Sequence, residues 1–208
     1  ARQVRNVIPL GEGKTNLSLD EKDFRAILEG GLAGLNGLHL ERYAFHDALA
    51  DGVSVAQVAA VTEWSGSLTS SGNTISRRAI ERGLRQLGTL GGGNHFIEFQ
   101  EVTDILRPET ATRWNIAPGQ LAIMIHSGSR GFGHEVASRY LKGGRMMVLD
   151  AASPEGEDYL DEMSCAANFA FVNRYILGAL VTTAVRRLRP SVRFQILADI
   201  SHNMVTRE

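Results

Sequence analysis

Three histidines stand beside small or polar residues where extended segments meet loops. They occur in the pairs Asn94-His95, His126-Ser127 and His202-Asn203. Each pair lies at the start or the end of a segment with strand-like composition, and strand ends meet at the edge of a sheet, where binding clefts form. Imidazole is a common ligand of divalent transition metals, and carboxylate or thiolate often completes the set. Three such histidines together would form most of a metal centre, although one histidine in such a place is more often a hydrogen-bonded structural residue.

Two glycine-containing loops have the composition of an anion-binding site. In the loop 91–94, glycine allows backbone amides to approach a phosphate closely. The loop 126–131 adds the hydroxyls of Ser127 and Ser129 and the guanidinium of Arg130, and all three groups donate hydrogen bonds to oxyanions. A plain turn in the first loop, and a tight surface turn with a solvated arginine in the second, are the competing interpretations.

Other candidate residues favour structural roles. His39 and His46 lie on helical or loop positions with polar neighbours. Cys165 lies in a helical pattern among alanines and phenylalanines, which fits a small buried residue better than a nucleophile.

The elements that must position these residues form a mixed α/β (α+β) pattern. Helices are predicted over 18–28, 40–49, 76–84, 134–141 and 153–188, the last with Ser153 as its cap and Pro154 at its first position. Extended segments are predicted over 4–13, 95–100, 121–125 and 192–200. The three histidine pairs therefore fall at the ends of the last three extended segments.

Composition excludes several classes of protein. The chain has 208 residues, and 22 Lys and Arg nearly balance 23 Asp and Glu, so any polyanion must be held by a local patch. A single cysteine and the lack of a secretory signal predict a cytoplasmic setting. The longest apolar stretch, 175–185, is shorter than the roughly 20 residues that cross a bilayer, so no membrane span is expected.

Four segments, in this order along the chain, resemble the motifs of one known family. They are 81–96, which ends in Gly-Asn-His-Phe, 126–131, which is His-Ser-Gly-Ser-Arg-Gly, 168–174, and 199–203, which contains the third histidine. All four resemble RtcB RNA ligases, and the resemblance extends over nearly the whole chain. Four motifs in the family's order are a highly specific signal.

The resemblance implies an activity and its cofactors. The family joins RNA 3'-phosphate or 2',3'-cyclic phosphate ends to 5'-hydroxyl ends, as in tRNA splicing or RNA repair, through enzyme-GMP and RNA-GMP intermediates. It implies GTP and two Mn²⁺ ions as cofactors, RNA such as tRNA halves as substrate, and an Archease-type activator as a possible partner. It also implies an RtcB-like fold with a large irregular sheet and surrounding helices.

Carried over motif by motif, the resemblance assigns three groups of site residues. The manganese ligands would be His95, His126 and His202. The nucleotide would be contacted by Asn94, Phe96, Glu98 and Asn203. Phosphate of the nucleotide or of the RNA end would be bound by Ser127, Ser129 and Arg130.

Two motifs of the family do not occur in this sequence. One is D-x-x-C-G-M, which supplies an aspartate and a cysteine as metal ligands, and Cys165 does not match it. The other is H-G-x-G-R, which carries the guanylylated histidine, so no catalytic residue is assigned here. We therefore expect residues 1–208 to be the incomplete central portion of a single RtcB-like catalytic domain, inactive alone. A non-catalytic nucleotide- or RNA-binding remnant and a metal-dependent phosphoesterase are the alternatives.

Overall fold

The computed structural model describes residues 2–11, 17, 19–38, 53–142 and 145–205 of the chain. The helix predicted over 40–49, together with His39 and His46, lies outside the described residues.

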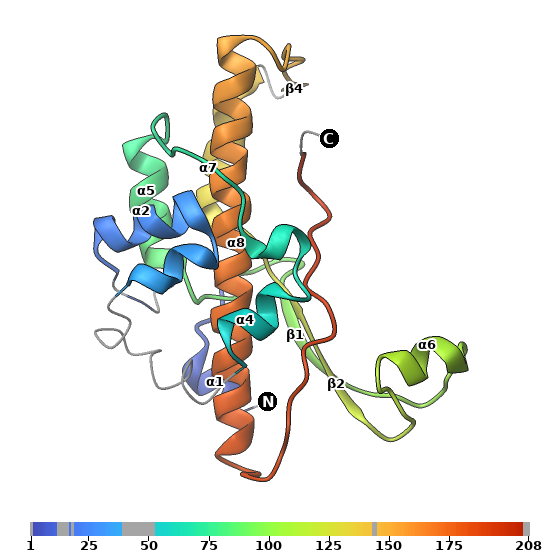
Figure 1. Ribbon diagram of the computed structural model, residues 1–208. Coiled ribbons are helices and arrows are strands. Elements are labelled where there is room, and N and C mark those ends of the chain that lie inside the picture. The colour runs from blue at the N-terminus through green and yellow to red at the C-terminus, as the bar shows by residue number, and fades with distance from the viewer. Residues whose placement is uncertain (1, 12–16, 18, 39–52, 143–144, 206–208) are drawn as a thin grey trace.

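One long helix, α8 (Pro154–Arg186), is the axis of the fold (Figure 1). It begins as predicted, because the Ser153 side chain accepts a hydrogen bond from the Gly156 amide and proline occupies the first turn. Buried residues occur on every side of its middle turns. The helix is therefore a core element around which the other segments pack.

Shorter helices surround this axis. They are α1 (Arg2–Val7), α2 (Glu21–Gly30), η1 (Ala33–Gly37), α4 (Val55–Ala59), η3 (Glu63–Gly66), α5 (Arg77–Gln86), α6 (Pro108–Arg113) and α7 (Arg130–Arg139). The helices predicted over 18–28, 76–84 and 134–141 are confirmed as α2, α5 and α7. Ser76 caps α5, whereas the cap of α2 is Asp20, which accepts from the Asp23 amide.

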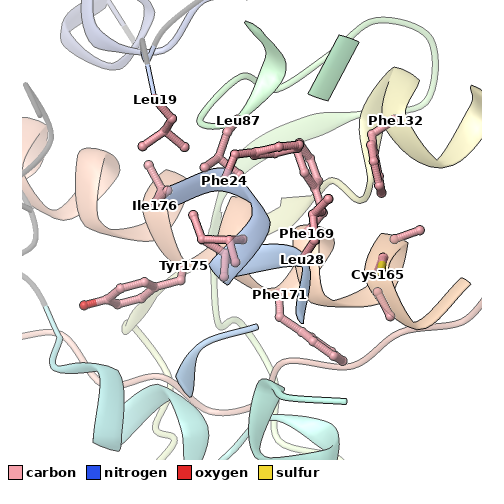
Figure 2. Close-up of a cluster of buried hydrophobic side chains, with 14 of the residues drawn as sticks. Leu19, Phe24, Leu28, Leu87, Phe132, Cys165, Phe169, Phe171, Tyr175 and Ile176 are labelled. Atoms are coloured by element: carbon pink, nitrogen blue, oxygen red, sulfur yellow. The ribbon is translucent and has the colours of Figure 1, made fainter. Parts of the chain in front are cut away.

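An aromatic cluster joins these helices at the centre of the core (Figure 2). The rings of Phe24 from α2, Phe132 from α7 and Phe169 from α8 lie 5.6 to 5.9 Å apart, centroid to centroid. All three side chains are fully buried. Edge-on and stacked contacts of this kind add to the stabilisation that apolar burial gives.

Cys165 lies in the same core, as its neighbours predicted (Figure 2). Burial raises the pKa of its thiol to about 12, so the group stays protonated and unreactive at neutral pH. The helix that carries it, α8, is long and apolar enough to meet a composition test for a membrane span, yet 78% of the tested window is buried inside the protein. Such burial is typical of a core helix.

The expected large sheet is wrong for the described part of the chain, which is mostly helical. Two antiparallel pairs of strands occur there: β1 (Phe96–Glu101) with β2 (Leu121–His126), and β3 (Leu141–Lys142) with β4 (Arg145–Met146). The first pair matches the segments predicted over 95–100 and 121–125. It forms a hairpin that projects from α8, with α6 near its far end (Figure 1).

Two extended segments were predicted wrongly. Residues 2–7 form a helix because Val4 and Ile8, four apart, pack together against α8 beside Leu177. Residues 192–197 alternate between partly buried and exposed side chains, but residues 192–200 form no strand because the segment lacks a continuous strand partner. The segment instead forms an isolated β-bridge between Asp199 and Thr62.

Two glycines in helices provide a matched test of core packing. A methyl group at Gly83 in α5 would overlap the Phe24 ring and approach Phe132 to 3.0 Å, whereas one at Gly178 in α8 would meet no atom within 4 Å. We predict that Gly83→Ala lowers the free energy of unfolding by about 1–3 kcal/mol. Gly178→Ala should raise it by roughly 0.5–1 kcal/mol through helix propensity. Urea unfolding measures both, and equal effects would contradict this packing.

Candidate metal and nucleotide site

The β1–β2 hairpin fixes one face of the site. Phe96 stands opposite His126 in the register, and their rings meet edge to face at 5.1 Å. The alternation of strands places Glu98 on this same face. The other face is apolar, and Ile97 and Ile125 pack against the cluster between α1 and α8. Burial of that face therefore orients His126 and Phe96 away from the core.

His202 contacts His126 directly. Their Nε2 atoms lie 3.3 Å apart, and their rings are perpendicular, with centroids 5.3 Å apart. Two nitrogens bound at roughly 2.0–2.1 Å to one tetrahedral ion are about 3.4 Å apart. The spacing of this pair therefore suits two ligands of a shared ion, and it also suits a single imidazole–imidazole hydrogen bond.

His95 lies next to this pair, with its ring centroid 6.1 Å from that of His126. Its Nδ1 is buried and has no hydrogen-bond partner. Burial lowers the pKa of His95, and the nearby charges of Arg130 and His126 lower it further, so the ring favours its neutral, metal-binding form. Nevertheless, no three His, Cys, Asp or Glu side chains among the described residues are close enough to hold an ion as they stand.

The glycine loop before His95 is shaped by Arg130. The Arg130 guanidinium donates to the Thr89 hydroxyl at 3.3 Å and to the Gly11 carbonyl at 3.4 Å. It also lies directly over Gly91, whose φ of +110° and lack of a side chain allow this approach. Arg130, the first residue of α7, thus contacts both the loop 88–93 and the Gly11 carbonyl.

Asn173, in the buried interior of α8, joins the loops that carry His95 and His126. Its side-chain oxygen accepts from the Gly88 amide at 2.7 Å. Its amide nitrogen lies 3.2 to 3.3 Å from the Thr89 carbonyl, the Ser127 hydroxyl and the Gly128 carbonyl. Ser127 in turn donates to the Leu90 carbonyl at 3.0 Å. One carboxamide therefore satisfies backbone groups from both loops.

Arg174, the next residue of α8, reaches the third histidine segment. Its Nε donates to Asp199 at 2.5 Å, and both side chains are almost buried, at 12% and 11% exposure. Burial raises the pKa of Asp199, an effect that Arg174 opposes and Glu63 adds to. Glu63 also accepts from the Ser201 amide at 2.8 Å. These bonds hold the chain immediately before His202.

The remaining predicted site residues lie on the surface around the cluster. Asn94, Glu98 and Asn203 are exposed, and Glu98 accepts a bond from Gln100. Ser129 is the residue before α7 and caps none of its amides, while the Gly131 amide bonds to the Gln86 side chain. The structure thus places the ten predicted residues around one end of the β1–β2 hairpin.

Sequence reasoning missed Asn173, Arg174 and Glu63. The first two fall in the motif 168–174, to which the sequence assigned no role. Their signal was an amide and a guanidinium inside an otherwise apolar helical stretch, since buried polar side chains need partners. Glu63 gave no such signal.

Two buried asparagines five residues apart on α8 allow a crossed test. Asn168 bonds to the Leu68 amide and carbonyl, away from the histidine loops, as Asn173 bonds to Gly88. We predict that Asn173→Ala and Asn168→Ala each destabilise the fold by at least about 1–3 kcal/mol, because buried groups lose their partners. Hydrogen exchange should accelerate at the Gly88 amide in the first variant and at the Leu68 amide in the second. Equal exchange at Gly88 in both would refute the assignment.

Comparison with protein families places the whole chain in one family. The family model described as tRNA-splicing ligase RtcB matches residues 1–208, the full length of the chain. The match includes all three histidine segments and the motif that contains Asn173 and Arg174. The chain belongs to the RtcB family of tRNA-splicing RNA ligases.

Proposed function

We propose that His95, His126 and His202 hold Mn²⁺ and that this site serves GTP-dependent joining of RNA 3'-phosphate or 2',3'-cyclic phosphate ends to 5'-hydroxyl ends. Membership of the family implies RNA ligase function and an RNA substrate. The observation that supports the metal site is the 3.3 Å separation of the His126 and His202 nitrogens beside the unpartnered nitrogen of His95.

The three histidines are of a residue type that binds divalent metals, but they are too few to form a complete set of ligands. Bound manganese would supply Lewis-acid polarisation and a template for attack on phosphorus. Three neutral imidazoles bring no negative charge to offset the desolvation of a dication, and the D-x-x-C-G-M motif that would bring it is not in this sequence. We therefore expect these histidines alone to bind Mn²⁺ weakly.

The nucleotide would lie across the histidine cluster. Asn94 and Asn203 each adjoin a histidine and are exposed, so their amides are placed to donate to nucleotide phosphate. Phe96 and Glu98 share the outer face of the hairpin, where an aromatic ring suits a base and a carboxylate accepts from the N–H groups of guanine. Selection of GTP would then depend on Glu98.

Phosphate of the nucleotide or the RNA end would meet Ser129 and Arg130 beside the glycine loop. The Ser127 hydroxyl is already bonded to Leu90 and Asn173, so its contribution would be to hold the loop in shape. RNA such as tRNA halves would be the substrate, and an Archease-type activator is a possible partner.

Replacement of each histidine by glutamine tests the metal site. We predict that His95→Gln, His126→Gln and His202→Gln each weaken Mn²⁺ binding by about tenfold or more, because each removes a ligand. His134→Gln, which changes an exposed histidine on α7 outside the cluster, is the matched control and should bind as the unmodified protein does. Electron paramagnetic resonance of free Mn²⁺ measures the affinity. Equal weakening by His134→Gln would contradict the assignment.

Incubation with Mn²⁺ and labelled GTP tests the covalent step. We expect no labelled protein band on a denaturing gel, because none of the six histidines lies in an H-G-x-G-R motif and covalent capture needs an activated nucleophile. A metal-dependent band that disappears when His39, His46 or His134 is changed would reveal another nucleophile. Release of inorganic phosphate from an RNA 3'-phosphate would instead favour the phosphoesterase alternative.

A further inference from the structure

We propose that Arg174 is a positioning residue that sets His202 against His126, with Asp199 as its partner. The consequence of this positioning for metal binding rests on the function proposed above. The placement of the two imidazoles does not depend on that function.

The guanidinium of Arg174 bonds to both histidine segments at once. Its Nη1 donates to the carbonyl of Ser127, the residue after His126, and its Nη2 donates to the hydroxyl of Ser201, the residue before His202. Its Nε donates to Asp199. The guanidinium carries its donors on three nitrogens spread over a planar fork, whereas a lysine ammonium carries them on one nitrogen and would not span these acceptors in the same way.

The three contacts differ in strength. Both bonds to the serines measure 3.4 Å, which is long and weak for an N–H donor. The bond to Asp199 is 2.5 Å and joins opposite charges at a place that water barely reaches. Asp199 therefore anchors the guanidinium, and the two weaker bonds set the separation of the histidine segments.

The C-terminal segment has a second attachment that does not involve His126. The Asp199 amide donates to the Val61 carbonyl, and the Glu63 amide donates to the Asp199 carbonyl. These backbone bonds would hold residues 199–201 near η3 even without Arg174. Loss of Arg174 should therefore shift His202 relative to His126 without detaching the whole segment.

The orientation of the two rings in the purified protein without metal is the primary test. Ring-proton nuclear Overhauser effects should join His126 to His202 and, within the hairpin, Phe96 to His126. In Arg174→Gln and in Asp199→Asn, the His126–His202 effect should be lost and the Phe96–His126 effect retained. Arg174→Lys, which keeps the charge opposite Asp199, is the variant least disturbing to folding and should show a weakened His126–His202 effect.

Arg139→Gln is the matched control, since it removes another arginine whose partner, Glu162, is a buried acid on α8. It should lower stability and leave both ring contacts intact. Retention of the His126–His202 effect in Arg174→Gln would overturn the proposal. Loss of the His126–His202 effect in Arg139→Gln as well would also overturn the proposal, because the loss would then reflect a general loosening of the fold.

Mn²⁺ affinity, measured by electron paramagnetic resonance of the free ion, separates this proposal from the function on which it rests. The unmodified protein should bind Mn²⁺, and Arg174→Gln should bind it about tenfold more weakly, as expected for His202→Gln. Absence of binding by the unmodified protein would contradict the metal site, while the metal-free ring contacts still decide the role of Arg174. Equal affinity of Arg174→Gln and the unmodified protein would count against positioning.

Discussion

The carboxamide of Asn173 is the constraint on which the site depends. It lies in the buried interior of α8, where an unpaired amide would be costly, and its oxygen and nitrogen find partners on two loops. One loop precedes β1 and ends at His95. The other follows β2 and begins after His126. Packing of α8 in the aromatic core therefore determines where two imidazoles lie, although neither histidine belongs to the core.

The charge of Arg130 bears on what the proposed site can hold. Its guanidinium lies over the glycine loop beside His95, whereas the charge of Arg174 is paired with Asp199. A positive charge next to the histidines disfavours a bare dication and favours phosphate. The proposed site would therefore suit a metal that arrives together with nucleotide phosphates, whose negative charge compensates what neutral imidazoles lack.

Local signals in the sequence predicted the elements that position the site. Ser76 and Ser153 marked true helix starts, and the run 121–125 marked the strand that ends at His126. Local signals did not predict which elements pair with one another. Burial alternates along 192–197, but alternation cannot show whether a partner strand exists. The large sheet was expected from the family resemblance, and the described residues form two antiparallel strand pairs instead.

The closeness of the histidines followed from family motifs and not from local pattern. No local rule indicates that Asn173 contacts Gly88, or that Arg174 contacts Asp199, because these contacts depend on how α8 lies against loops distant in sequence. The polar residues inside an apolar helix were visible, but the identity of their partners required the fold.

The return of the chain after α8 bears on the order of folding. Figure 1 shows the last segment running back along α8 towards α4 and the hairpin, and the Ser201–Glu63 bond joins residues 138 apart in sequence. Contacts between distant residues close large loops and form slowly. During synthesis the residues of the core helices and of the hairpin emerge before residue 202. We therefore expect the histidine cluster to assemble last, after the core that positions His95 and His126.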